Sequence, residues 1–293
     1  MTNKSVFRIF SFMLLIGWLS ACQKPTDNDA LKPEENLETT DLMVALPTDE
    51  ATSNDLSVRN RQESYCTYYG PRVKVGYGYL RSWMNVSRHG KPLAIGAEMT
   101  ASSLEGLPQD PEDFAVSTYI LPLHHYVKGL TPFDHLTINW NVHGHEPPGV
   151  YDIPHFDFHF HELSIAEQTS IPPYEVSPAG FDNLPSIDFL PDFYLRAPGG
   201  VPGMGTHWVD LRSPELNGMP FTHTFIYGTY KGRVHFIEPM ITHALIKSGQ
   251  TVLKEIRQPK KFYEHSYYPT RYAIWKDCRH NRHYVALDNF VWH

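Results

Sequence analysis

The chain has 293 residues and carries 25 Lys and Arg against 32 Asp and Glu, a formal net charge of −7 at neutral pH. It has no basic face or long cluster of Lys and Arg to neutralise phosphates, so nucleic acid is a poor partner candidate. The chain is long enough to bury a sizeable hydrophobic core.

The N-terminus has the pattern of a secretion signal. Lys4 and Arg8 form a short basic region, an apolar run follows over 9–18, and small residues close the segment. A permanent transmembrane helix is the alternative, but the run is shorter than the roughly 20 apolar residues that such a helix needs. We therefore predict a cleaved signal peptide over 1–21.

The sequence Leu19-Ser20-Ala21-Cys22 resembles a lipobox, the cleavage signature of bacterial lipoproteins. The resemblance implies that Cys22 becomes the lipid-bearing first residue of the mature protein. Its acyl chains would anchor the protein to a membrane, since each buried methylene contributes about 0.8 kcal/mol. An ordinary signal peptide with a chance cysteine is the alternative. Gln23 stands where an Asp would favour the inner membrane, so we expect an exported protein anchored in the cell envelope, at the outer membrane.

Residues 22–60 contain no aromatic side chain, and they hold nine acidic residues against three basic ones. This composition is typical of a flexible, acidic tether. Residues 61–293 are rich in Tyr, Phe and Trp, and one large domain is the simplest interpretation. Cys66 and Cys278 lie near its two ends, and in an oxidising compartment a disulfide could join them. Two free cysteines would give the same sequence.

Strand patterns dominate the folded part. Apolar runs bounded by turn residues predict strands over 73–86, 92–99, 118–123, 135–141, 155–162, 222–229, 234–238, 271–275 and 284–290. Short links that contain Gly predict antiparallel hairpins at 89–92 and 230–232. The helical candidates are brief, at 102–105, 165–169 and 241–247. We therefore predict a mainly β, single antiparallel domain, sandwich-like or barrel-like, with few short helices.

The most informative segment is 155–162, which reads His-Phe-Asp-Phe-His-Phe-His-Glu. Successive side chains of a strand point to opposite faces, so the three Phe share one face and the opposite face holds His155, Asp157, His159 and His161. Imidazole and carboxylate are natural ligands for zinc, copper or iron, so the polar face is a candidate metal site. A solvated strand face, or imidazoles that satisfy backbone groups, is the alternative.

One strand rarely completes a metal site, so neighbouring strands should supply further ligands. His207 and Glu238 are the best candidates, because both lie in compact, apolar stretches. We predict a mononuclear site for a divalent transition metal, with the ligands His155, His159, His207 and Glu238. Asp157 could bind the metal, orient an imidazole or act as a base.

Two further histidines precede this strand. His143 and His145 lie beside glycine and proline residues, so a loop that caps the site is at least as plausible as direct ligation. A longer irregular segment over 172–202, crowded with Pro and Gly, is either a functional loop or a structural wrap.

The chain resembles a family of exported bacterial proteins known from a Thermus member that is encoded with an extracytoplasmic sigma factor and its anti-sigma factor. The ordered motifs that carry this resemblance are Gly76-Tyr-Gly78, Gly90-Lys-Pro92, Ile95-Gly96, Gly106-Leu-Pro108, Gly144-His-Glu-Pro147, Pro154-His-Phe-Asp-Phe-His-Phe160, Met204-Gly205, His207-Trp208 and Glu238-Pro-Met240. The resemblance implies a β-rich single domain, and it supplies no established reaction. It places His161 where another aromatic residue is expected, which argues against His161 as a ligand.

Two enzyme families share part of this pattern. The Phe158-His-Phe-His161 stretch is similar to the first zinc motif of α-type carbonic anhydrases, but the downstream motifs of that family are absent. Cupin-type oxygenases use a similar ligand composition, although His155 and His159 are four residues apart here rather than two.

Three functions therefore stay open. The first is a membrane-anchored metal-binding protein related to envelope stress. The second is a metal-free envelope protein that binds a ligand or partner through its aromatic surface. The third is a cupin-like, metal-dependent hydrolase or oxygenase. Four protein ligands would close a zinc site, whereas three would leave a position for water or substrate.

Overall fold

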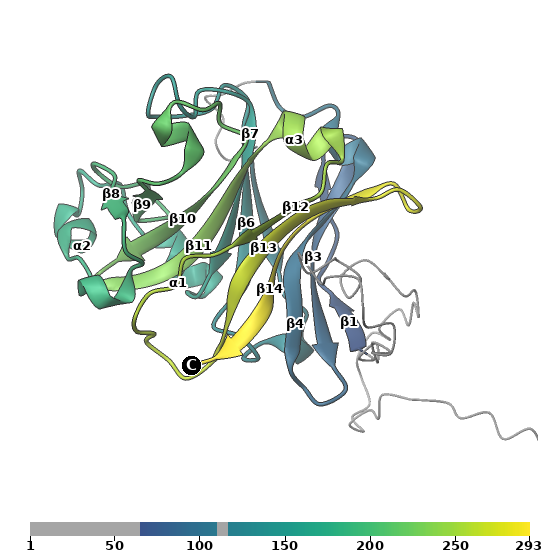
Figure 1. Ribbon diagram of the computed structural model, residues 1–293, viewed down its shortest axis with the longest axis horizontal. Helices are drawn as coiled ribbons and strands as arrows, with labels where there is room; N and C mark the ends of the chain where they lie inside the picture. Colours follow the sequence, from purple (N-terminus) through teal and green to yellow (C-terminus); the bar gives the residue numbers. More distant parts are fainter. Residues whose placement is uncertain (1–64, 110–116) are drawn as a thin grey trace, which may run out of the picture. The chain divides into compact units, whose positions relative to one another are not determined.

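A computed structural model describes residues 65–109 and 117–293 (Figure 1). The predicted signal peptide, the lipidation residue Cys22 and the tether over 22–60 lie outside these residues. Among the described residues, no helix is long and apolar enough to cross a membrane.

The first of two antiparallel sheets, sheet I, contains strands from both ends of the described chain. They are β1 (Tyr65–Tyr69), β2 (Val73–Val75), β3 (Gly78–Ser87), β4 (Pro92–Thr100), β12 (Val252–Glu255), β13 (Tyr267–Asp277) and β14 (Arg282–Trp292). Their order is β1-β3-β4-β14-β13-β12, and β2 pairs with β3.

The second sheet, sheet II, is formed by the middle of the chain. Its strands are β5 (Thr118–Pro122), β6 (His135–Asn141), β7 (His155–His161), β8 (Tyr194–Arg196), β9 (Thr206–Asp210), β10 (His223–Tyr230) and β11 (Arg233–Thr242). Their order is β5-β6-β7-β11-β10-β9-β8, so β7 lies near the centre.

Helices are short in the described part of the chain. The α-helices are α1 (Ile165–Thr169), α2 (Pro178–Asp182) and α3 (His243–Ser248), and the 3-10 helices are η1 (Ala101–Leu104), η2 (His125–Val127), η3 (Ile187–Phe189) and η4 (Pro214–Asn217). The prediction of a mainly β, antiparallel domain with few short helices is confirmed. The two sheets form a sandwich and not a closed barrel.

Both predicted hairpins are present, joining β3 to β4 and β10 to β11. The strand expected over 73–86 is instead broken into β2 and β3 at Gly76. The φ of Gly76 is +51°, and a Cβ there would lie 2.1 Å from the carbonyl oxygen of Glu105. A side chain would be strained and would clash, so the turn requires glycine. The short strands β1, β8, β9 and β12 were not predicted.

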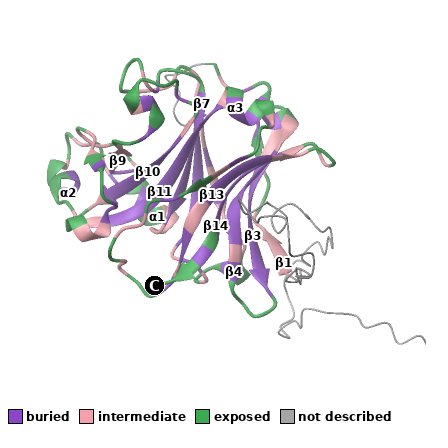
Figure 2. Cartoon of the chain, viewed as in Figure 1, coloured by how far each residue is buried: buried purple, intermediate pink, exposed green. Residues whose placement is uncertain are grey.

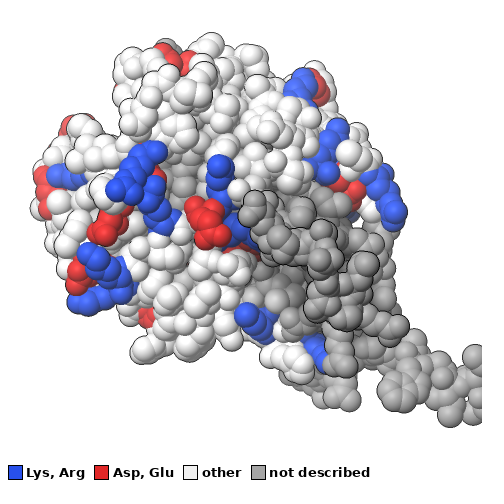
Figure 3. All heavy atoms as spheres, viewed as in Figure 1, with Lys and Arg blue, Asp and Glu red and all other residues white. Residues whose placement is uncertain are grey.

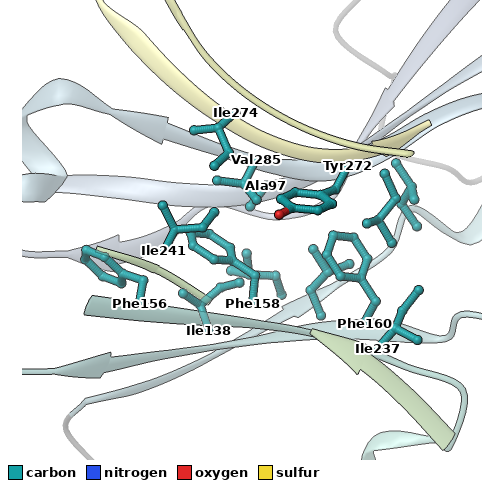
Figure 4. Close-up of a cluster of buried hydrophobic side chains, with 14 of the residues drawn as sticks. Ala97, Ile138, Phe156, Phe158, Phe160, Ile237, Ile241, Tyr272, Ile274 and Val285 are labelled. Carbon is teal, nitrogen blue, oxygen red and sulfur yellow. The ribbon is translucent and has the colours of Figure 1, made fainter. Parts of the chain in front are cut away.

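The main hydrophobic core lies between the two sheets (Figure 4). Phe156, Phe158 and Phe160 of β7 all point into it, as the alternation of the sequence predicts, and none is exposed to solvent. Sheet I contributes facing side chains such as Ile274 and Val285. Each fully buried Phe stabilises the fold by roughly 1.5–3 kcal/mol relative to an exposed one. This packing fixes which face of β7 points away from the core.

The outer face of sheet II is also covered. A smaller apolar cluster forms on it, in which Ile226 and Met240 of the sheet pack with Tyr151 and Phe221. Accordingly, the central strands β6, β7, β10 and β11 are buried along most of their length (Figure 2). The polar residues of β7 lie on this covered face and are buried, so the alternative of a solvated histidine face is wrong.

The disulfide that the sequence suggested between Cys66 and Cys278 is absent. Cys278 is free and exposed, in the turn between β13 and β14. Cys66 lies on β1, which is separated from β14 by β3 and β4. Three strand spacings amount to roughly 14 Å, whereas a disulfide needs Cα atoms within about 7 Å. The two cysteines lie near the two ends of the domain in the sequence, but the fold does not bring them together in space.

Charged side chains on the surface lie in groups of mixed sign on the face drawn in Figure 3. Pairs of opposite charge on the surface of the molecule include Lys247 with Glu105 at 2.7 Å and Arg257 with Asp210 at 2.7 Å. Exposed pairs of this kind contribute about 0–1 kcal/mol each, so the fold depends mainly on its core.

Candidate metal centre

Three strands of sheet II bring one group of ligand atoms together. His159 lies on β7, Glu238 on β11 and His207 on β9. Between β11 and β9 runs β10, whose Gly228 pairs with His207 in the ladder. A glycine offers no side chain above the sheet at that point. The space that Gly228 leaves is filled by the ring of Phe236 from β11, against which His159 and His207 pack.

The donor atoms of this first group have the separations that a metal ion imposes. Nε2 of His159 lies 3.4 Å from Oε2 of Glu238, and Nε2 of His207 lies 3.7 Å from the same oxygen. All three donor atoms lie within 4.8 Å of one another. Tetrahedral ligands at about 2.1 Å from a zinc ion are about 3.4 Å apart. The arrangement fits one ion with three protein ligands.

Burial makes these atoms costly unless something binds them. The side chains of His159 and Glu238 are 1% and 2% exposed. Nε2 and Nδ1 of His159 and Oε2 of Glu238 have no hydrogen-bond partner among the described residues. Each unsatisfied buried polar group costs roughly 1–3 kcal/mol. Such atoms in a folded protein call for an explanation, of which a bound ion is one.

Electrostatics favours the ligating form of the imidazoles. Burial lowers the pKa of His159 to about 3 and that of His207 to about 4, so both rings are neutral at physiological pH. Burial, and then the negative charge of Asp157, raise the pKa of Glu238. A cation at this point would lower the pKa of Glu238, because a nearby positive charge favours the ionised carboxylate.

The ring of Phe236 packs against both imidazoles of the first group. Its centroid lies 4.9 Å from that of His159 and 5.3 Å from that of His207, with steep interplanar angles. Gly228 makes room for this ring, since a Cβ there would lie 1.9 Å from it. The aromatic ring thus limits the orientations available to two of the three candidate ligands.

The predicted set of four ligands is divided by the structure. It brings His159, His207 and Glu238 together, but it places His155 in a second group with His145 and Asp157. The physical reason is the rise of the strand. Residues four apart on a strand are separated by roughly 13 Å, too far to share one ion comfortably.

The second group combines a loop and a strand. His145 lies in the loop between β6 and β7, while His155 and Asp157 lie on β7. Asp157 approaches Nε2 of His155 to 3.2 Å and Nε2 of His145 to 3.6 Å. His145 was predicted to lie in a loop that caps the site, and it is in fact a member of this group. His143 is exposed and belongs to neither group.

His161 belongs to neither group but to a buried stack of histidines. Its ring is stacked at 4.8 Å on that of His135 from β6 and at 6.1 Å on that of His235 from β11. The sequence did not single out His135 or His235. A β-bulge between β10 and β11 turns His235 toward this face beside Phe236, and alternation alone could not reveal it.

Comparison of the chain with protein-family models, with curated proteins and with solved structures finds no match. The resemblance to exported proteins of the Thermus type therefore stays a prediction.

Proposed function

We propose that the β-sandwich binds a divalent transition metal through His159, His207 and Glu238. The observation that carries this proposal is the convergence of three donor atoms, of which Nε2 of His159 and Oε2 of Glu238 are buried without a hydrogen-bond partner among the described residues. Two imidazoles and one carboxylate are a common set of protein ligands for zinc and for iron(II). Copper is the third ion that this donor set would accept.

The coordination resembles that of a reactive site more than that of a structural one. Structural zinc sites have four protein ligands, whereas catalytic sites commonly have three and keep a position open. The side chain of His207 is 18% exposed, so the first group reaches solvent on one side. A metal here would lower the pKa of a bound water to about 7 and supply hydroxide for hydrolysis. Metal-dependent hydrolysis or oxygenation is therefore the second candidate function.

We further propose that this chemistry takes place in the cell envelope. The predicted signal peptide and the lipobox at Cys22 support export and anchoring by lipid, with the acidic segment over 22–60 as a tether. A Cys22→Ala variant expressed in a bacterial host should lose incorporation of labelled fatty acid. If the variant still carries lipid, Cys22 is not the attachment point.

Metal analysis of the untagged, purified chain tests the binding proposal. After dialysis against zinc, elemental mass spectrometry should find metal in the wild type, and Glu238→Gln should lose one equivalent. Gln keeps the size of Glu but is a poor ligand, so the comparison isolates the carboxylate. His143→Ala is the matched control, because this exposed histidine belongs to neither group. A wild type that holds no metal would leave a metal-free, partner-binding role as the better function.

A further inference from the structure

The second group, formed by His145, His155 and Asp157, has a geometry that a second ion would explain. Nε2 of His155 and Oδ1 of Asp157 are 3.2 Å apart. Neither atom has a hydrogen-bond partner among the described residues, although both are buried. The short separation is that of an ion pair without hydrogen-bond geometry. It is close to the roughly 3.4 Å expected between two ligands of one tetrahedral zinc ion.

Backbone carbonyls orient both imidazoles. Nδ1 of His155 lies 2.7 Å from the carbonyl oxygen of Ile153, and Nδ1 of His145 lies 2.8 Å from that of Glu146. A carbonyl oxygen can only accept, so each Nδ1 carries the proton. When an ion displaces any proton from Nε2, this nitrogen presents its lone pair on the side of the carboxylate. This is the usual arrangement of a histidine that ligates a metal.

The carboxylate is held in the same way. Nδ2 of Asn141, at the end of β6, donates a hydrogen bond of 2.7 Å to Oδ2 of Asp157. This contact leaves Oδ1 directed toward His155. The ring of Phe221 packs against the imidazole of His155 at 5.4 Å, which closes one side. All three candidate ligands are thus fixed by partners outside the group.

An ion pair within the group is the rival explanation. His145 and Asp157 could attract each other as imidazolium and carboxylate, and the group would then need no metal. That pairing leaves the facing atoms of His155 and Asp157 unsatisfied, at a cost of roughly 1–3 kcal/mol for each group. A cation between them satisfies both at once, and so would a second proton on the ring of His155. The metal stoichiometry below separates these two explanations.

We propose that His145, His155 and Asp157 form a second site for a divalent transition metal, beside the first but separate from it. No residue belongs to both groups. Asp157 and His159 are two positions apart on β7, a distance of roughly 7 Å. Bridged two-metal sites hold their ions about 3.5–4 Å apart, usually in hydrolases that act on phosphates or peptides. The two sites here are neighbours that share no ligand.

The second site is the more accessible of the two. The side chain of His145 is 36% exposed, compared with 18% for His207 in the first site. A ligand on a loop at the surface gives an ion a direct path to the buried pair on β7. We expect this site to fill and empty faster than the first, with a clearly larger dissociation rate constant.

Metal stoichiometry of the untagged full chain with zinc and with cobalt(II) tests this site. The wild type should bind two equivalents, and Asp157→Asn and Glu238→Gln should each bind one. The double variant should bind none, and His143→Ala should keep two. Because Asp157 is buried, the half-exposed His145→Gln provides a second variant with little risk to folding. It should weaken one equivalent at least tenfold and leave the other unchanged, with circular dichroism as the check on folding.

Each alternative result separates this site from the proposed function. The wild type could bind only one equivalent of metal. If Glu238→Gln loses this equivalent and Asp157→Asn keeps it, the second site is overturned and the first site is supported. One equivalent with the opposite response would overturn the first site and support the second. A single equivalent that either variant abolishes would mean one shared site, and would overturn the independence proposed here.

Discussion

At the residue scale, the candidate centres depend on atoms that the rest of the fold leaves unsatisfied. Nε2 of His159 and Oε2 of Glu238 are buried and have no hydrogen-bond partner in the part of the chain that the structure describes. By contrast, the buried carboxylate of Glu98 on sheet I accepts hydrogen bonds from Arg81 and Tyr284. The protein is therefore able to satisfy a buried carboxylate when no ion is needed. The contrast between Glu98 and Glu238 supports a role in binding for the latter.

Gly228→Ala should weaken metal binding without removing any ligand. The added Cβ would lie 1.9 Å from the ring of Phe236, so the ring must move. Because the imidazoles of His159 and His207 pack against this ring, they would be displaced with it. Overpacking of this kind costs about 1–3 kcal/mol of stability. Displaced supporting groups typically reduce metal affinity by about 10-fold to 100-fold. Competition with a chromophoric zinc chelator measures the change.

Gly90→Ala is the control for this substitution. Gly90 lies in the hairpin of sheet I with a φ of +80°, and no atom lies within 4 Å of the position that an added Cβ would take. The variant should lose stability through backbone strain and keep its affinity for zinc. Equal zinc affinities in the two variants would show that Phe236 does not position the ligands.

At the element scale, the sequence predicted β7 and the division of its two faces correctly. Strict alternation over seven residues leaves no other arrangement for Phe158 and His159, and the core between the sheets confirms it. The strand that carries His207 escaped prediction because β9 has only five residues and follows an irregular segment. The prediction that His155 and His159 bind one ion was wrong. It took account of the strand face that they share, but not of the rise along the strand, which separates them.

The stack of histidines on β6, β7 and β11 yields a prediction about stability. Both ring nitrogens of His161 are buried and find no hydrogen-bond partner within residues 65–109 and 117–293, which costs roughly 1–3 kcal/mol. His161→Leu should therefore stabilise the metal-free protein, by about 1 kcal/mol once the imperfect fit of Leu is included. Zinc stoichiometry should not change, because His161 belongs to neither group of ligands. Urea unfolding with and without chelator provides both measurements.

Phe160→Ala gives the comparison from the opposite face of the same strand. It leaves a cavity in the main core and should destabilise the protein by about 3–5 kcal/mol. If His161→Leu also destabilises the protein, the buried imidazole makes favourable interactions, such as hydrogen bonds to internal water, and the reasoning from unsatisfied nitrogens fails.

At the scale of the whole molecule, residues of both sheets and of the segment before β13 line a small cavity of about 30 Å³. Tyr227 and Ile237 of sheet II and Tyr268 of sheet I line it, together with Glu162 just after β7. Burial raises the pKa of Glu162 to about 8, although Arg233 at 3.6 Å acts in the opposite direction. The carboxyl group that lines this cavity is therefore mostly protonated at neutral pH.

The raised pKa of Glu162 sets a pH dependence of stability with a defined sign. The unfolded value is about 4.3, so between pH 4.3 and about 8 the folded state holds a proton that the unfolded state has lost. The contribution of Glu162 therefore falls as pH rises through this window. Buried histidines act in the opposite direction, because the pKa values of His159 and His235 are lowered to about 3. Their contribution rises with pH up to about 6.5.

These opposing contributions predict that the metal-free protein is most stable near pH 6.5. Glu162→Gln cannot titrate, so it should gain stability relative to the wild type by a few kcal/mol between pH 5 and pH 8. Urea unfolding in the presence of a chelator, at several pH values, measures the difference. Glu264→Gln is the matched control, since Glu264 also pairs with Arg233 but is mostly exposed, and its loss should change stability by at most about 1 kcal/mol at every pH. A constant difference between wild type and Glu162→Gln from pH 5 to pH 8 would show that Glu162 keeps an ordinary pKa in the folded protein.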